Sequence, residues 1–154
     1  MGKTCALILM THGTWGSALL ESASLVAGEI PEAVSLPLLE GQQIEAYETE
    51  GRTLLARLRP KEVILVADLL GGSPYYAAAR LGYEYDCPVL TGLSLELLLA
   101  LCRRREQMPS WEAARAALED TRQAAILVNE YVGNGLRSGE RQPQDRCPSG
   151  QSTS

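Results

Sequence analysis

Apolar residues follow two alternating patterns along the chain. Uninterrupted apolar runs are typical of buried strands, and apolar residues three to four positions apart are typical of amphipathic helices. The runs predict strands over 4–10, 33–38, 62–67 and 87–91, and the helical spacing predicts helices over 17–27, 42–58, 74–81, 94–104 and 111–122. The segment from Ala124 to Val128 fits either a continuation of the last helix or a short fifth strand.

The alternation of strands and helices predicts parallel β-α-β units with helices on both faces of a central sheet. With right-handed crossovers, four such strands form an open, doubly wound parallel sheet. In the common order 2-1-3-4 the first and third strands are neighbours, and ligands bind beyond their carboxyl ends. We therefore expect an α/β fold with this strand order and a site at that edge.

The composition changes near the carboxyl end of the chain. The 154 residues suffice for one domain with its own core. From Gly133 onward Gly, Ser, Pro, Gln and Arg dominate, which is typical of disorder. We expect a globular domain over 1–132 and a disordered polar tail over 133–154. Because no apolar run approaches the roughly 18 residues of a membrane span, and no signal-like block opens the chain, we expect a cytoplasmic protein without membrane insertion.

Charge and residue counts exclude several kinds of function. Fourteen basic and nineteen acidic residues give a net charge of −5, which argues against nucleic-acid binding. The single histidine excludes a multi-histidine metal site, and the four cysteines lack the short spacings of zinc ligands or a redox dithiol. We therefore expect neither a metal nor a cofactor, and the histidine, His12, becomes the main candidate for chemistry.

His12 follows the first predicted strand and Asp68 follows the third, so the expected strand order places them side by side. Asp68 could hold the Nδ1–H of the imidazole and leave the lone pair on Nε2. Gly13, directly after His12, would let a partner approach the ring closely. A histidine and an aspartate can also simply end their strands, and this interpretation stays open here.

Gly71, Gly72 and Ser73 precede a predicted helix, with Ser73 as the expected N-cap and Pro74 as the expected first helical residue. Their backbone N–H groups, the hydroxyl and the positive end of the helix dipole suit a phosphate. A neutral imidazole, an orienting carboxylate and a phosphate cradle together describe a phosphohistidine site. The alternative is a turn followed by a helix, without a ligand.

Other residues near these strand ends are candidates for the rim of the site. The candidates are Gly13, Thr14, Trp15, Tyr76 and Ser94. The two aromatic side chains among them could equally serve only to pack against their neighbours.

Two segments carry a resemblance to a known family. Thr11-His12-Gly13-Thr14-Trp15-Gly16 follows the first strand, and Asp68-Leu69-Leu70-Gly71-Gly72-Ser73-Pro74 follows the third. Together with Thr91-Gly92-Leu93-Ser94-Leu95 after the fourth strand, they resemble the enzyme IIA domain of the mannose-type sugar phosphotransferase system. The resemblance covers about residues 3–131.

The resemblance implies a cytoplasmic phosphocarrier. His12 would accept a phosphoryl group at Nε2 from the phosphohistidine of the carrier HPr and pass it to a histidine of a IIB component, which phosphorylates an incoming sugar. Asp68 matches the family's aspartate that bonds the active histidine, and Ser73 matches its phosphate-contacting serine. Family members are typically homodimers that exchange a C-terminal edge strand, which favours a strand over Ala124–Val128.

The chain departs from the family pattern at two places. Tyr76 stands where the family usually has Asn, two residues after the proline of the Gly-Gly-Ser-Pro string. Ser94-Leu95-Glu96 stands where the family favours Asn, a hydrophobic residue and Pro. Ser94 can still cap a helix, whereas Glu96 would repel a phosphate if it faced the site.

Three other functions fit parts of the pattern. One is a regulatory phospho-acceptor domain of the same fold that does not feed transport. Another is the phosphotransfer subunit of a dihydroxyacetone kinase, although the glycine-rich variations expected there are missing. The third is a hydrolase triad of Ser73, His12 and Asp68, which the absence of a Gly-x-Ser-x-Gly elbow argues against.

Overall fold

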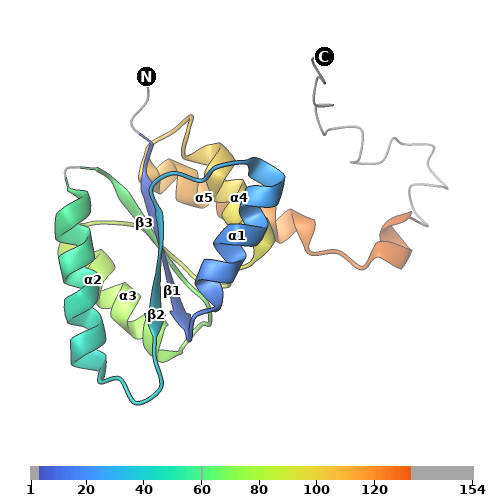
Figure 1. Ribbon diagram of the computed structural model, residues 1–154. Helices are drawn as coiled ribbons and strands as arrows, with labels where there is room; N and C mark the ends of the chain where they lie inside the picture. The colour runs from blue at the N-terminus through green and yellow to red at the C-terminus, as the bar shows by residue number, and fades with distance from the viewer. Residues whose placement is uncertain (1–3, 60, 133–154) are drawn as a thin grey trace. The chain divides into compact units, whose positions relative to one another are not determined.

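The four predicted strands form one sheet in the computed structural model, which describes residues 4–59 and 61–132. The strands lie in the order β2-β1-β3-β4 and all pair in parallel, which confirms the predicted α/β fold (Figure 1). β4 is shorter than the predicted 87–91, because only two of its residues pair with β3. The bounds are β1 (Ala6–His12), β2 (Ala33–Leu38), β3 (Val63–Ala67) and β4 (Val89–Leu90).

The predicted helices are all present, with small shifts at their ends. α3 continues beyond the predicted Leu81 to Tyr85, and it ends where Asp86 adopts a left-handed conformation with a φ of 49°. The bounds are α1 (Trp15–Ala27), α2 (Ile44–Leu58), α3 (Ser73–Tyr85), α4 (Leu95–Arg104) and α5 (Ser110–Ala124).

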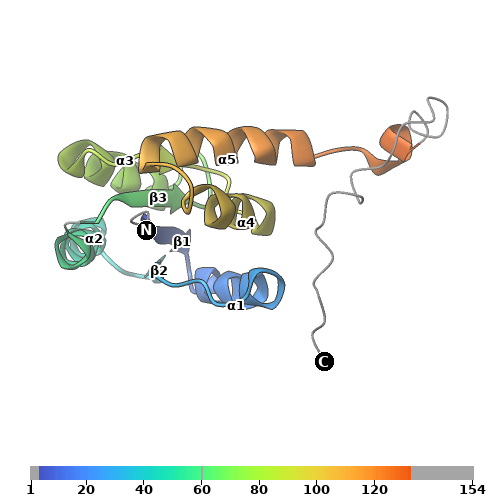
Figure 2. The same cartoon turned by 90° about the horizontal axis from the view of Figure 1, so that it is seen from above.

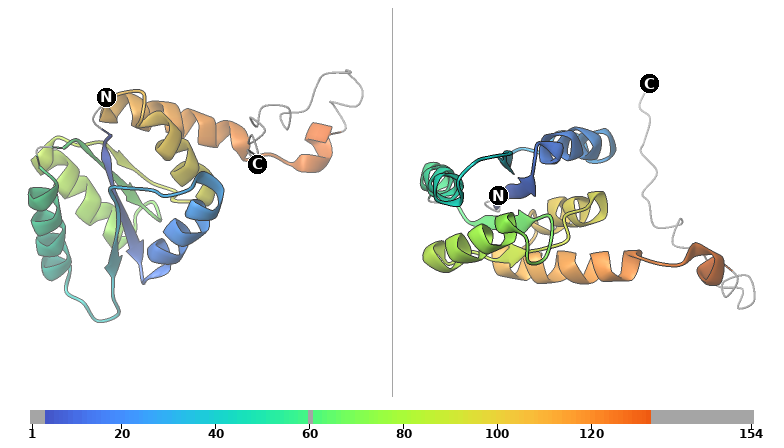
Figure 3. Two further views of the ribbon diagram at one scale, coloured as in Figure 1. Left: turned by 45° about the horizontal axis from the view of Figure 1, so that its top comes forward. Right: turned by 90° about the horizontal axis from the view of Figure 1, so that it is seen from below.

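Successive residues of β1 supply two cores, one on each face of the sheet. Ala6, Ile8 and Met10 pack in a cluster with residues of α2 and α3. Leu7 and Leu9 pack in the other cluster, with residues of α1, α4 and α5. Side chains of a strand alternate between its two faces, so a strand covered by helices on both sides must be apolar throughout. Figures 2 and 3 show α2 and α3 together on one side of the strands, with α1 and α4 on the other.

The start of α3 differs from the expectation. Gly72, not Ser73, is the N-cap, so Ser73 is the first helical residue and Pro74 the second. Proline is tolerated at either position because the N–H groups of the first helical turn have no partner within the helix. The Ser73 hydroxyl is therefore not the helix cap.

Residues up to Arg122 form one compact unit, and those from Gln123 onward belong to another. Ala124 ends α5, residues 125–127 are neither helix nor strand, and a short helical turn covers 128–132. The single chain thus has no fifth strand over Ala124–Val128. A strand needs the backbone groups of a neighbour, so a strand exchanged with a second copy stays a prediction. The predicted disordered tail, 133–154, lies outside the described residues.

Over residues 4–59 and 61–132, no helix is long and apolar enough to cross a membrane. The same part of the chain holds no group of three or more His, Cys, Asp or Glu side chains that could bind a metal ion.

Candidate functional site

His12 and Asp68 meet where two neighbouring strands end. His12 is the last residue of β1, and Asp68 directly follows β3. Met10 pairs with Ala67 in the parallel register, and the Asp68 N–H donates to the Met10 carbonyl at 3.1 Å. The two candidate side chains therefore start from the same edge of the sheet, as the strand order predicted.

Asp68 holds His12 by both its backbone and its ring. The His12 backbone N–H donates to Asp68 Oδ2 at 2.7 Å, and ring Nδ1 lies 3.0 Å from Oδ2 and 3.2 Å from Oδ1. The Asp68 side chain is only 8% exposed, whereas that of His12 is 47% exposed. An ionised carboxylate only accepts hydrogen bonds, so the network assigns the proton to Nδ1 and leaves the lone pair on Nε2.

A buried tyrosine lies in the electrostatic field of the same carboxylate. The side chain of Tyr47 is fully buried, and its hydroxyl donates to the Leu36 carbonyl at 2.8 Å. Burial raises the pKa of the Tyr47 hydroxyl, and the negative charge of Asp68 raises it further. Tyr47 is therefore a neutral donor on the α2 side of the sheet.

The turn after His12 is held by two hydrogen bonds. The Gly13 N–H donates to the Leu38 carbonyl at 2.8 Å, and Thr11 Oγ1 donates to the Gly13 carbonyl at 2.7 Å. Gly13 has a φ of +65°, which glycine adopts without strain. Thr11 was not a predicted site residue, although a hydroxyl next to His12 in an apolar strand was a signal available in the sequence. The side chain of Thr11 is fully buried, and its hydrogen bond to Gly13 joins the residues before and after His12.

The ring of His12 lies against the start of α3. A Cβ built on Gly72 would lie 3.3 Å from His12 Nε2, so the imidazole and the helix N-terminus are adjacent. Gly71, with a φ of +81°, turns the chain into this position. Ser73 follows as an exposed residue, and its hydroxyl accepts no capping bond. The structure thus brings His12, Asp68 and Gly72 together.

The predicted rim residues lie at the starts of the helices that follow β1, β3 and β4. Thr14 is the N-cap of α1 without a side-chain bond, and Trp15 and Tyr76 are 40% and 54% exposed. Ser94 caps α4 as expected, with its hydroxyl accepting from the Leu97 N–H at 3.1 Å. Further exposed apolar side chains at this edge were not predicted: Leu39, Leu69, Leu70 and Leu95.

The loops that follow the four strands, 13–14, 39–43, 68–72 and 91–94, contain neither lysine nor arginine. Any positive potential that these loops offer a ligand therefore comes from backbone N–H groups and the α3 dipole. An anion at this edge would therefore be bound more weakly than at a site with a guanidinium.

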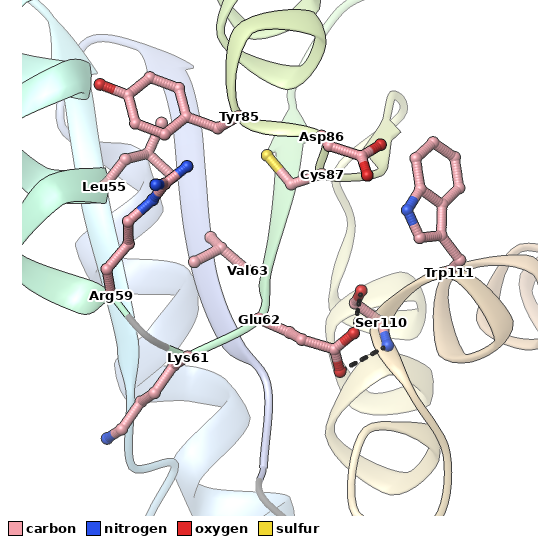
Figure 4. A pocket seen from close by; sticks show the side chains of 10 residues that line it. All are labelled: Leu55, Arg59, Lys61, Glu62, Val63, Tyr85, Asp86, Cys87, Ser110 and Trp111. Atoms are coloured by element: carbon pink, nitrogen blue, oxygen red, sulfur yellow. Dashed lines mark hydrogen bonds between the residues drawn. The ribbon is translucent and has the colours of Figure 1, made fainter.

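A separate cavity of about 410 Å³ lies near the start of β3, at the other end of the strand from Asp68 (Figure 4). Two of its charged groups contact neighbouring side chains. The Glu62 carboxylate accepts from the backbone and hydroxyl of Ser110 at 3.3 and 3.2 Å, and the Arg59 guanidinium lies 5.1 Å from the centre of the Tyr85 ring. Burial raises the pKa of the Cys87 thiol to about 11, so this thiol is neutral.

The fold and the polar cluster at the ends of β1 and β3 define a doubly wound α/β protein with a candidate site at the switch point of the sheet. The model of one family of this class, described as PTS system fructose IIA component (EIIA-man), matches residues 6–119, and the chain belongs to this family. Members of the family are phosphotransferases of the sugar phosphotransferase system. This confirms the resemblance found in the sequence.

Individual relatives agree with the family assignment. The chain is 28% identical to the fructose-specific EIIA component of Bacillus subtilis over 67% of its own length and 72% of that protein. It is also 28% identical to the mannose-specific EIIAB component of Escherichia coli over 77% of its length, but it spans only 37% of that longer protein. The phosphotransferase system EIIA component of Streptococcus agalactiae superposes with a TM-score of 0.76 at 22% identity, over 82% of this chain and 98% of that one. At this identity the superposition supports the fold alone.

Proposed function

We propose that His12 is the phosphorylated residue of a cytoplasmic phosphocarrier. It accepts a phosphoryl group from the phosphohistidine of HPr and passes it to a IIB component for sugar uptake. The observation that carries this proposal is the half-exposed imidazole, whose Nδ1 lies 3.0 Å from a buried carboxylate while Nε2 faces the start of α3. A surface position suits a donor and an acceptor that are themselves proteins.

The chemical step is a displacement at phosphorus. The Nε2 lone pair attacks the phosphoryl group as the P–N bond to the donor imidazole breaks, and that bonding pair returns to the donor ring. The Nδ1–H stays on His12 and stabilises the developing imidazolium charge through Asp68. Transfer to the acceptor histidine reverses these roles, so no cofactor, oxidant or metal-bound nucleophile is needed.

The transferred group finds its donors at the start of α3. We infer that its oxygens accept hydrogen bonds from the backbone N–H groups of Gly71 and Ser73 and from the Ser73 hydroxyl, since the Gly72 N–H donates to the Leu69 carbonyl. Helix N-termini bind phosphate through such N–H groups and the helix dipole. The N-cap of α3 has no side chain that could occupy them. The loops that follow the four strands would offer the negatively charged phosphoryl group backbone dipoles but no lysine or arginine. This favours transfer of the group to the next protein over its retention on His12.

Two experiments test this proposal in sequence. The purified chain is incubated with labelled phosphoenolpyruvate, enzyme I and HPr, and His12→Ala serves as the control. We expect acid-labile label on the wild type and none on His12→Ala; an unlabelled wild type would refute the proposal. Labelled protein is then mixed with a IIB protein, and discharge of the label supports a role in uptake. Label that stays on the chain would favour a regulatory phospho-acceptor.

A further inference from the structure

Gly72 lies directly against the imidazole that the proposed function makes the phosphoryl acceptor. A Cβ built on Gly72 would lie only 2.7 Å from His12 Cε1 and 3.3 Å from Nε2. Carbon atoms that are not bonded make contact at about 3.5–4.0 Å, so no L side chain fits here unless the ring or the backbone moves. The opposite side of the ring is fixed, because Nδ1 lies within hydrogen-bond distance of both oxygens of Asp68.

The need for glycine at this position is steric and not conformational. Gly72 has a φ of −78° and a ψ of 167°, values that any residue adopts easily. Gly71 and Gly13 are the reverse case, since each has a positive φ and open space where a Cβ would lie. The three glycines of the site therefore serve two different physical purposes, and only Gly72 makes room for His12.

The missing side chain has a second effect at the same place. Gly72 is the N-cap of α3, where Ser, Thr, Asp or Asn would accept a hydrogen bond from the N–H of the second or third helical residue. The second residue, Pro74, has no N–H, so a capping side chain would take the N–H of Tyr75. A glycine leaves that donor available to an oxygen atom from outside the helix.

We propose that Gly72 is a positioning residue for phosphoryl transfer. Its missing side chain lets Nε2 lie at the N-terminus of α3 while Nδ1 stays on Asp68. This inference rests on the proposed role of His12. It predicts a loss of phosphoryl transfer that a change in the stability of α3 would not explain. A serine at position 72 is a good helix cap and would leave the fold intact, yet it would impair the site. An alanine brings the steric conflict without a capping oxygen.

The test compares Gly72→Ala and Gly72→Ser with the wild type and with Gly51→Ala. Gly51 lies on the side of α2 that faces α3, and a Cβ there would meet Leu81 Cδ1 at 2.5 Å, so this control adds a methyl group at a close contact away from His12. Initial rates of phosphorylation are measured with phosphoenolpyruvate, enzyme I and HPr. We expect both Gly72 variants to be about 10–100-fold slower, as misplacing a reacting group by about 1 Å can produce. Gly51→Ala should keep the wild-type rate, because its added methyl group lies away from His12.

Nitrogen-15 NMR of the unphosphorylated histidine adds a readout that does not depend on the partners. The wild type should show one tautomer, with the proton on Nδ1, and both Gly72 variants should show a mixture or a shift towards the other. Wild-type rates in both variants, or an unchanged tautomer, would overturn the role of Gly72. An unlabelled wild type would instead refute the function proposed for His12, and the tautomer measurement would still decide whether Gly72 positions the ring.

Discussion

Asp68 does more for the site than hold a side chain, because it binds the backbone of His12 as well as its ring. The end of β1 and the orientation of the imidazole are thus set by one carboxylate. Thr11 adds a bond to the Gly13 carbonyl on the far side of His12. At the scale of residues, the imidazole is exposed and the groups that orient it are buried. Such an arrangement keeps the geometry fixed while the surface stays open to a partner.

Asp68→Asn tests the electrostatic part of this arrangement. The amide oxygen can still accept from Nδ1–H, so we expect the fold and the tautomer to persist. It cannot stabilise the positive charge that develops on the ring, and hydrogen bonds to charged groups contribute about 1.5–3 kcal/mol. Phosphorylation of His12 should therefore slow by about 10–150-fold, measured as an initial rate with phospho-HPr. A wild-type rate in Asp68→Asn would rule out this role.

The raised pKa of the Cys87 thiol predicts that the protein becomes less stable at alkaline pH. Burial is the main cause that raises the pKa of its thiol from 9.0 to about 11. The folded protein therefore keeps a proton that the unfolded chain loses between these values, and stability falls as pH rises through this window. In Cys87→Ala, the loss of unfolding free energy between about pH 8 and pH 10.5 should be smaller than in the wild type. Equal losses in urea titrations would show that Cys87 contributes nothing to this slope.

At the scale of elements, α2 and α3 are joined by ion pairs as well as by apolar packing. Glu48 on α2, with its side chain 11% exposed, accepts from Arg80 Nε on α3 at 2.6 Å and lies 3.5 Å from Arg52 Nη2. Arg52 also forms a paired contact with Glu84 at 2.8 and 2.9 Å, but both of these side chains are well exposed. Partly buried pairs are less screened by water than exposed ones, so the two carboxylates should differ in their effect.

Glu48→Gln measures that difference, with Glu84→Gln as the matched control. Removing the charge of Glu48 while keeping its shape should lower the free energy of unfolding by about 1–2 kcal/mol. The same change at Glu84 should have a much smaller effect, which added salt removes. Urea unfolding at low and high ionic strength provides both values. If the two variants were equally stable, burial of Glu48 would not matter to the α2–α3 contact.

At the scale of the whole molecule, the sheet ends in a very short edge strand. β4 pairs with β3 through only Val89 and Leu90, and within the described chain no strand lies on its other side. Open strand edges are sites of pairing with other chains. Ile126, Leu127 and Val128 are 46%, 60% and 59% exposed in the single chain. These features support the prediction that the protein is a homodimer in which the segment around Ala124–Val128 is exchanged.

Truncation tests this assembly. A chain ending at Gln123 lacks the apolar segment and should be a monomer by size-exclusion chromatography with light scattering. A second variant ending at Val132 keeps the segment and lacks the predicted tail, so it should remain a dimer. A dimer that survives truncation at Gln123 would refute strand exchange. Loss of the dimer in the variant that ends at Val132 would also contradict the prediction, because this variant keeps the segment that is expected to be exchanged.

The sequence by itself determined the order and type of the elements. Apolar runs and helical spacing are local properties, and right-handed crossovers leave few ways to join four parallel strands. His12 and Asp68 could therefore be placed together from their positions after the first and third strands. The family resemblance followed from the residues around them.

Only the tertiary structure decided the contacts at this edge of the sheet. The two bonds from His12 to Asp68, the clearance at Gly72 and the start of α3 at Ser73 depend on atoms brought together from different strands and helices. The sequence pattern identified Gly72 only as part of a turn or phosphate loop, because a steric need for glycine is invisible until its neighbour is known. Local patterns encode which face of an element is buried; distances between elements follow from how those faces pack.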